Sequence, residues 1–339
     1  MKAGGTVDFE KDLKLGLGDM WYPICQSGLI QSQPVGLQRL GQDIVAWRDS
    51  KGTVHVHNDS CLHRGAKLSV GKIVDDNLRC AYHGWCYDAG GQCVTIPTSK
   101  VAESRLAPRL CLPTYESQER AGLVWVYFSQ GESAAPELII PEELEHPAWS
   151  GFVCESIWSA NWILIVENLA DPMHGPFLHG QSLTLSRGAL EDDMRVTKTA
   201  NGFIVEREGQ RGVNFDWSEI FGHDALWVRL DIPLPFGPKG TLRILCFCTP
   251  IDENKSLVYF LRYRNLTGWK RAYWRFLYRT FWVKQHFKVI EQDRVILESQ
   301  RGAQSRELEH LSNSDRGVSE LRRFLRDKLA ERKPAERSV

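Results

Sequence analysis

Two short segments each carry one cysteine and one histidine at close spacing. Cys61 precedes His63 by two residues and Cys80 precedes His83 by three, with sixteen residues between the two pairs. A zinc finger groups its two cysteines together and its two histidines together, so this order fits a zinc site poorly. A 2Fe–2S cluster with two histidines on one iron needs two thiolates and two imidazoles. We therefore predict that Cys61 and Cys80 hold one iron of such a cluster, and that His63 and His83 hold the other.

A second pair of histidines, His174 and His179, lies five residues apart. On a regular helix, side chains at this spacing point about 140° apart and cannot bind one small ion. Gly175 and Pro176 lie between the histidines, and a proline ring removes a helical hydrogen bond and clashes with the preceding turn. A broken or widened turn would bring both imidazoles to one point. Taken alone, the two histidines are equally compatible with packing in a core, so a metal site needs a third ligand.

A carboxylate is the third ligand expected of a non-haem iron, because two imidazoles and one carboxylate leave positions open for oxygen. Asp293 falls on an apolar stripe of a predicted helix over 287–300, together with Val289 and Ile296. A carboxylate on such a face is unfavourable unless a cation or hydrogen bonds compensate for its burial. We predict Asp293 as the ligand, with Glu291 and Glu298 as alternatives; on its own, Asp293 would suit a structural salt bridge.

The elements that must position these residues change in type along the chain. Gln42–Arg48 and Gly122–Phe128 are rich in β-branched and aromatic residues, as strands are. Helical character appears over 161–179, and the later half combines antiparallel strands with helices, which indicates an α+β arrangement. The expected later elements are hairpins turning at Asn201-Gly202 and at 252–255, a helix over 269–300 and a helix over 319–330.

The composition is that of an ordinary globular chain. The 339 residues include 42% hydrophobic and 25% charged residues, and the length suits about two domains. A formal net charge of zero gives no indication of nucleic-acid binding. The sequence carries no recognisable signal peptide or membrane span, and its nine cysteines lack the spacing of a disulfide framework. We therefore expect reduced thiols and a cytoplasmic location.

The metal motifs resemble those of the Rieske non-haem iron oxygenases, which include the α subunits of ring-hydroxylating oxygenases. CLHRGAKLSVG and CAYHGWCYDAGGQC are similar to the two parts of the family's cluster-binding box, with Ala81 where proline is usual. The run from Asn168 to His179 matches the family's iron-binding pattern N-x-x-D-x-x-H-x-x-x-x-H at every fixed position. The run EQDRVILESQ resembles the segment that carries the distant aspartate ligand. The likeness extends over nearly the whole chain.

The resemblance implies a fold, cofactors and an assembly. It implies a Rieske 2Fe–2S β-domain in residues 1–135, with a helix-grip (START-like) antiparallel-sheet catalytic domain in residues 136–339. The cofactors would be the Rieske cluster and a mononuclear Fe(II). In the family, the aspartate at the position of Asp171 bridges an iron ligand, here His174, to a cluster histidine of the neighbouring subunit, here His83. A homotrimer is therefore expected, and Asn168 is expected to line the iron site.

The function that the resemblance implies is that of a terminal oxygenase. It would use O₂ and electrons from NAD(P)H to hydroxylate or oxidatively demethylate an aromatic or polycyclic hydrophobic substrate. A separate reductase or ferredoxin would supply the electrons, and the chain itself has no G-x-G-x-x-G dinucleotide motif after a predicted strand. The single-chain layout favours a monooxygenase over a dioxygenase. Two alternatives stay open: a Rieske electron-transfer protein without catalytic iron, and a zinc-stabilised binding protein.

One further segment, Trp269–Phe287, combines aromatic residues with arginines at four-residue spacing. Such a segment is usually a packed helix beneath a solvated basic face. A hydrophobic substrate entrance and a contact with a membrane surface are the other interpretations. The residues alone do not decide among the three.

Overall fold

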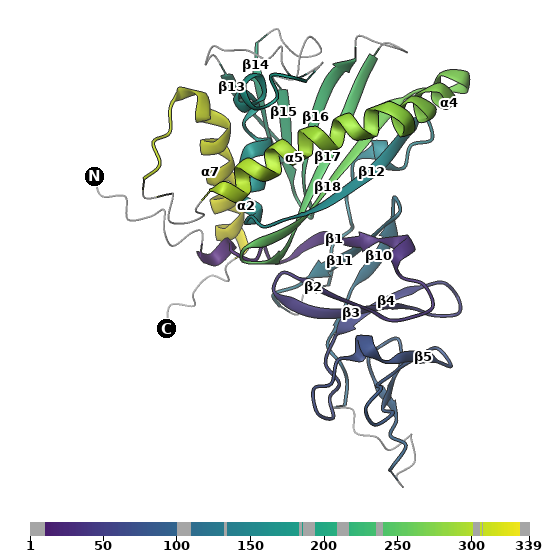
Figure 1. Ribbon diagram of the computed structural model, residues 1–339. Coiled ribbons are helices and arrows are strands. Elements are labelled where there is room, and N and C mark those ends of the chain that lie inside the picture. The colour runs from purple at the N-terminus through teal and green to yellow at the C-terminus, as the bar shows by residue number, and fades with distance from the viewer. Residues whose placement is uncertain are drawn as a thin grey trace, which may run out of the picture. The chain divides into compact units, whose positions relative to one another are not determined.

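The computed structural model describes residues 11–99, 110–131, 134–182, 185, 194–208, 217–234, 240–300, 306 and 308–332. These residues form two compact units. One is Asp19–Pro136, and the other comprises the described residues of Met1–Gly18 and Glu137–Val339 (Figure 1). Residues 11–18 group with the second unit, where the indole nitrogen of Trp162 donates a hydrogen bond to the carbonyl oxygen of Leu13 at 2.6 Å.

The N-terminal unit is built from antiparallel strands in three small sheets. The run LVWVYF of β11 (Leu123–Phe128) is rich in β-branched and aromatic residues, as strands are, and is buried throughout. A core around Trp47, Leu68, Leu78 and Tyr87 also contains Cys61 and Cys80. The strand order of the first sheet is β1 (Met20–Gln26), β11, β10 (Ser117–Arg120). The order of the second is β2 (Val35–Arg39), β3 (Gln42–Arg48), β4 (Val54–Asn58), β9 (Thr114–Tyr115). The order of the third is β5 (Lys72–Val74), β6 (Asn77–Arg79), β7 (Cys86–Tyr87), β8 (Cys93–Thr95).

The C-terminal unit contains a seven-stranded antiparallel sheet. Both predicted hairpins are confirmed: Thr199 pairs with Gly202 across the first turn, and Asp252 pairs with Lys255 across the second. The strand order is β12 (Trp149–Trp158), β18 (Lys255–Asn265), β17 (Gly240–Asp252), β16 (Leu226–Leu234), β15 (Trp217–Gly222), β14 (Gly202–Arg207), β13 (Met194–Thr199).

A long helical segment crosses this sheet (Figure 1). It consists of α4 (Gly268–Leu277), a π-helical turn η6 (Tyr278–Trp282) and α5 (Val283–Ser299). The predicted α+β class is confirmed, with a large antiparallel sheet and helices packed on it. Further helices are α2 (Trp162–Leu169), α3 (Gly175–Leu178) and α7 (Arg316–Arg332), and short 3₁₀ turns lie at η1 (Ser27–Leu29), η2 (Leu68–Val70), η4 (Glu142–Leu144), η5 (Pro172–His174) and η7 (Asn313–Asp315).

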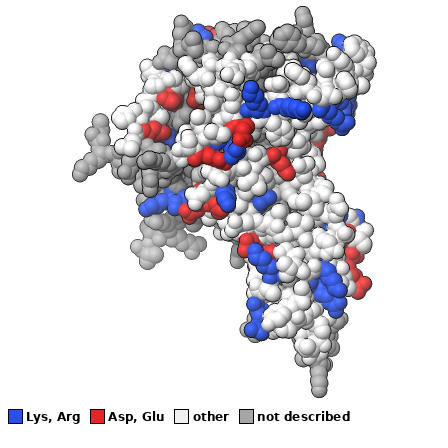
Figure 2. Space-filling view, in the orientation of Figure 1, with Lys and Arg blue, Asp and Glu red and all other residues white. Residues whose placement is uncertain are grey.

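The aromatic and basic segment is divided between core and surface. Trp274, Tyr278 and Trp282, spaced four residues apart, are buried, whereas Trp269 and Phe276 are exposed. Figure 2 shows Lys and Arg side chains in a row over α4 and α5. Packing in the core accounts for the buried aromatic residues. It does not account for the exposed aromatic residues, which lie on the same helical segment as the Lys and Arg side chains. Within the described ranges, no helix is both long and apolar enough to cross a membrane.

Candidate metal centres and the cavity beside them

Two loops of the N-terminal unit share one backbone arrangement. In each, a cysteine carbonyl accepts a hydrogen bond from the glycine four residues later, at 2.8 Å from Gly65 to Cys61 and at 3.1 Å from Gly84 to Cys80. The φ angles of Gly65 and Gly84 are 70° and 73°, in the left-handed region that favours glycine. These two turns therefore depend on glycine, which explains its place after each Cys/His pair.

The four predicted cluster ligands lie within these two turns. Cys61 and Cys80 are buried, and burial raises the pKa of the Cys61 thiol, although a 3.2 Å contact with the Tyr87 hydroxyl opposes the rise. The rings of His63 and His83 lie with their centroids 4.5 Å apart. Two thiols and two imidazoles make up the ligand set of a 2Fe–2S cluster with mixed cysteine and histidine ligands.

In the C-terminal unit, the helix breaks between the two histidines, as their spacing requires. α2 begins at Trp162, directly after the cap residue Asn161, and ends at Leu169. The 3₁₀ turn η5 and the single-turn α3 follow it. Pro172 and Pro176 lie at the starts of η5 and α3, where a missing amide hydrogen does no harm. His174 ends η5 and His179 follows α3. The break is thus a junction between 3₁₀ and α turns, not a widened π turn.

The structure brings His174, His179 and Asp293 together. The Oδ1 atom of Asp293 lies 3.1 Å from Nε2 of His179 and 3.6 Å from Nε2 of His174. His179 and Asp293 are buried, and Asp293 Oδ1 has no hydrogen-bond partner of good geometry in the described part of the chain. A buried carboxylate oxygen that faces two imidazole nitrogens is suited to a cation. The donor set of two nitrogens and one oxygen is the set that non-haem Fe(II) takes.

The electrostatics of this group follow from the same contacts. Burial lowers the pKa of His179, but the adjacent Asp293 carboxylate outweighs this effect, so the pKa is raised overall. A metal ion binds the neutral imidazole, so protons and metal compete for the His179 nitrogen. Glu291 and Glu298, the alternative ligands, both form ion pairs with Arg294 and are not in the group.

Other polar groups hold the two imidazoles in place. Nδ1 of His179 lies 3.0 Å from Oε1 of Gln292, and Nδ1 of His174 contacts the carbonyl oxygen of Asp171. The Asp171 carboxylate accepts a hydrogen bond from the Met173 amide at 2.9 Å, while its Oδ2 atom lies 4.0 Å from His174 Nδ1. Burial raises the pKa of Asp171, and His174 opposes the rise. The backbone of Asp171 therefore orients His174, and Oδ2 has no hydrogen-bond donor among the described residues.

Gln292 is a functional candidate that sequence reasoning missed, although it directly precedes Asp293. Gln292→Leu should weaken iron binding about 10- to 100-fold, because an outer hydrogen-bond partner fixes the tautomer and orientation of a ligand histidine. Dialysis against graded chelator concentrations, with iron analysis, measures this loss. Gln285→Leu is the matched control on the same helix and should retain iron. Equal retention in both variants would remove Gln292 from the site.

A buried ion-pair network holds α2 against the C-terminal helix. The Glu167 carboxylate forms ion pairs with Nε of Arg322 at 2.7 Å and with Nη2 of Arg306 at 2.8 Å. Arg322 also reaches Glu309 at 2.6 Å. Because α2 leads directly into the histidine turns, this network helps to fix the position of His174.

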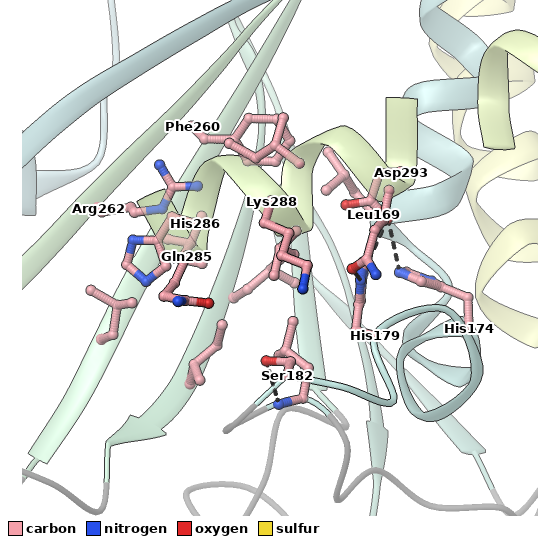
Figure 3. A pocket seen from close by; sticks show the side chains of 18 of the residues that line it. Leu169, His174, His179, Ser182, Phe260, Arg262, Gln285, His286, Lys288 and Asp293 are labelled. Atoms are coloured by element: carbon pink, nitrogen blue, oxygen red, sulfur yellow. Dashed lines mark hydrogen bonds and ion pairs between the residues drawn. The ribbon is translucent and has the colours of Figure 1, made fainter. Parts of the chain in front are cut away.

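A cavity opens beside the three clustered side chains. Asn168 and Asp171 line it together with His174, His179 and Asp293. Figure 3 shows His174, His179 and Asp293 at one end, with Lys288 near the middle and Arg262 and His286 at the other end. The sheet side is predominantly apolar and is formed by Leu230, Ile232, Leu234, Leu242, Ile244, Phe260 and Arg262.

Two family models match separate parts of the chain. The Rieske [2Fe-2S] domain matches residues 20–116, and the Vanillate O-demethylase oxygenase C-terminal domain matches residues 158–331. The first match contains the two cysteine–histidine loops. The second contains both histidines and the aspartate of the clustered group.

Individual proteins show the same likeness. Protein TIC 55, chloroplastic, of Arabidopsis thaliana is 30% identical over 334 residues, covering 93% of this chain and 60% of the relative. The 5,5'-dehydrodivanillate O-demethylase oxygenase subunit of Sphingobium sp. is 27% identical, with coverages of 91% and 74%. The chain thus spans about 60% of the length of the first of these relatives. A solved carbazole-bound oxygenase in complex with ferredoxin, from carbazole 1,9a-dioxygenase, superposes with a TM-score of 0.75 at 22% identity, covering 94% of this chain and 92% of that one.

Proposed function

The chain belongs to the Rieske non-haem iron oxygenase family, and from this premise we propose that it is a terminal oxygenase acting on an apolar aromatic or polycyclic substrate. Its cofactors are a Rieske 2Fe–2S cluster and a mononuclear iron. One observation carries the proposal: His174, His179 and Asp293 converge at the end of an apolar cavity. An electron-transfer protein without catalytic iron would need neither the clustered ligands nor the cavity.

We assign the ligands as the sequence predicts them. Cys61 and Cys80 would hold one cluster iron, and His63 and His83 the other, while the clustered histidines and Asp293 would hold the mononuclear iron. When bound, these groups supply single electrons and an O₂-activating centre. The chain's own contribution is to orient the imidazoles through Gln292 and the backbone of Asp171, and to enclose the substrate in apolar walls. We propose the two domains as residues 1–135 and 136–339; the compact units divide one residue later, after Pro136, and the described residues 11–18 group with the C-terminal unit.

We propose monooxygenation, by hydroxylation or oxidative demethylation, in preference to dioxygenation. The support is the match of residues 158–331 to a domain named for vanillate O-demethylase, together with the demethylase subunit among the relatives. A dioxygenase is the competing assignment, because the solved oxygenase with the same fold comes from carbazole 1,9a-dioxygenase.

The assembly and partners follow as proposals from the same family. Electrons would come from NAD(P)H through a separate reductase or a ferredoxin, and a ferredoxin accompanies the solved oxygenase named above. A homotrimer would place His83 of one subunit next to Asp171 of another. Asp171 Oδ2 has no hydrogen-bond donor among the described residues, so it could accept a hydrogen bond from that imidazole. We propose the cytoplasm as the location, because the nine cysteines lack the spacing of a disulfide framework. Imaging of the tagged chain would distinguish this from a chloroplast location, since one relative is named chloroplastic.

Oxygen consumption against a substrate panel tests this function. With a surrogate reductase and NADH, apolar aromatic ethers and arenes should stimulate O₂ uptake. Under ¹⁸O₂, a hydroxylated product should carry one labelled oxygen atom, since a monooxygenase transfers one atom of O₂. Two labelled atoms in one product would identify a dioxygenase. Uptake that no panel member stimulates, in protein with both metal sites filled, would count against an apolar aromatic substrate.

A further inference from the structure

One charged side chain interrupts the apolar wall of the cavity. Arg262 lies on β18, two residues after Phe260, so both side chains project from the same face of the strand. Across the sheet, Arg262 pairs with Ile244, which also lines the cavity. Arg262 is only 2% exposed. A guanidinium group is therefore buried among aliphatic and aromatic side chains, where an uncompensated charge is unfavourable.

The contacts of Arg262 do not neutralise it. Its Nη1 atom donates to the Tyr278 hydroxyl at 3.4 Å, near the limit for a hydrogen bond, and its Nε atom is buried without a partner. The guanidinium carbon also lies 5.9 Å from the centre of the Phe260 ring. In the described part of the chain, no carboxylate lies within ion-pair distance of Arg262.

Two half-buried arginines of the same unit, Arg243 and Arg322, do have carboxylate partners. Arg243, on the neighbouring strand, pairs with Asp231 at 2.8 Å and also with Glu143. Arg322 pairs with Glu167 and Glu309. Arg262 differs from these two arginines in facing a cavity and in having no carboxylate within ion-pair distance among the described residues.

The surroundings of Arg262 add no negative charge. Burial, reinforced by the charge of Arg262, lowers the pKa of His286 to about 2, so this histidine is neutral. Lys288, a second cation, lines the cavity nearby. The acidic residues that line the cavity are Asp293, at the metal end (Figure 3), and Asp171, which contacts His174.

We propose that the substrate carries a carboxylate or a similar anionic group, and that Arg262 binds this group at the end of the cavity away from the metal site. The inference rests on the proposed function, which it narrows from apolar aromatic compounds to apolar aromatic acids. A guanidinium and a carboxylate match in shape and form paired hydrogen bonds. The unpartnered Nε and the neutral His286 are then available to the same anion.

The separation of the two ends limits the reacting position. His286, beside Arg262, precedes Asp293 by seven residues on α5, which corresponds to about 10 Å along the helix axis. A carboxylate at Arg262 therefore directs the far end of a one- or two-ring molecule towards the metal site. Oxidation is expected at a carbon or substituent distal to the carboxylate, not at the adjacent ring position.

Binding of a matched pair of probes tests the proposal without turnover. We would titrate 2-naphthoate and 2-naphthamide, which share a ring system and differ in charge, into the anaerobic metal-loaded protein by calorimetry. The unaltered chain should bind 2-naphthoate more tightly than the amide. Arg262→Gln should weaken 2-naphthoate binding about 10- to 100-fold, as expected for the loss of hydrogen bonds to a charged group, and should leave the amide nearly unchanged. Arg262→Lys keeps the charge but not the planar guanidinium group. Its affinity for 2-naphthoate should lie between that of the unaltered chain and that of Arg262→Gln.

Lys288→Gln is the matched control, because it removes an equal charge from a more exposed position in the same cavity. It should change 2-naphthoate binding by about threefold or less. Equal weakening of both probes in Arg262→Gln would assign Arg262 a structural role, and absence of 2-naphthoate binding in the unaltered chain would also overturn the proposal. Because the readout is binding, the two failures are distinguishable: loss of 2-naphthoate binding in Arg262→Gln would still show a carboxylate site at Arg262 in a chain that oxygenates no member of the substrate panel.

Discussion

Asp293→Ala is expected to reduce O₂-dependent product formation to the background rate. The two remaining imidazoles cannot hold iron firmly without the carboxylate, so iron should fall from about three to about two atoms per chain. The cluster spectrum should be unchanged, because the predicted cluster ligands come from a different compact unit. Iron analysis, the visible spectrum and turnover are measured on one preparation.

Two neighbouring carboxylates provide the controls for this experiment. Glu291→Ala and Glu298→Ala remove carboxylates from the same helix that pair with Arg294 and lie outside the metal group. Both variants should keep the third iron and most of the activity. If Asp293→Ala retains iron and turnover while either glutamate variant loses them, the third ligand is wrongly assigned.

Asp171→Asn is expected to slow electron transfer from the cluster to the mononuclear iron while both metal sites stay filled. Asparagine has nearly the same shape, and the backbone carbonyl that contacts His174 is retained. The negative charge and the free carboxylate oxygen are lost, and an amide cannot accept hydrogen bonds on both sides. Oxidation of the reduced cluster in the presence of O₂ and substrate should slow about 10- to 100-fold.

Stopped-flow absorbance of the prereduced cluster measures this rate. Full iron content and an unchanged cluster spectrum in Asp171→Asn are required, so that slow oxidation cannot be attributed to metal loss. Cluster oxidation and product formation at the parent rate would mean that Asp171 only caps η5 through its contact with the Met173 amide. Electrons would then pass between the sites by another route.

Local rules predicted much of this fold and of the candidate sites. The Asn201-Gly202 turn, the antiparallel pair around 252–255 and the helix break at Gly175–Pro176 all follow from the conformations that glycine, asparagine and proline favour or forbid. The apolar stripe that contains Asp293 predicted its burial, because helical spacing alone places it with Val289 and Ile296. These features depend on residues close together in the sequence.

Features that depend on distant segments were not predictable in this way. Gln292 contacts His179 only because α5 crosses the sheet opposite the histidine turns, and Arg262 lines the cavity only through the register of β18. No local pattern distinguishes Arg262 from a surface arginine on an alternating strand. Nδ1 of His174 contacts the backbone carbonyl oxygen of Asp171, while the carboxylate Oδ2 atom lies 4.0 Å away. The sequence pattern gives the spacing of these two residues but does not show which oxygen of Asp171 the imidazole contacts.

Metal analysis of the unaltered chain, purified without oxygen, tests the central claim most directly because it needs no knowledge of the substrate. We expect about three irons per chain, of which two give the absorbance of a cluster with mixed cysteine and histidine ligands. His179→Ala should then hold about two irons with an undiminished cluster spectrum. An unaltered chain that binds about two irons, with a full cluster and no further iron on reconstitution, would contradict the claim and identify an electron carrier.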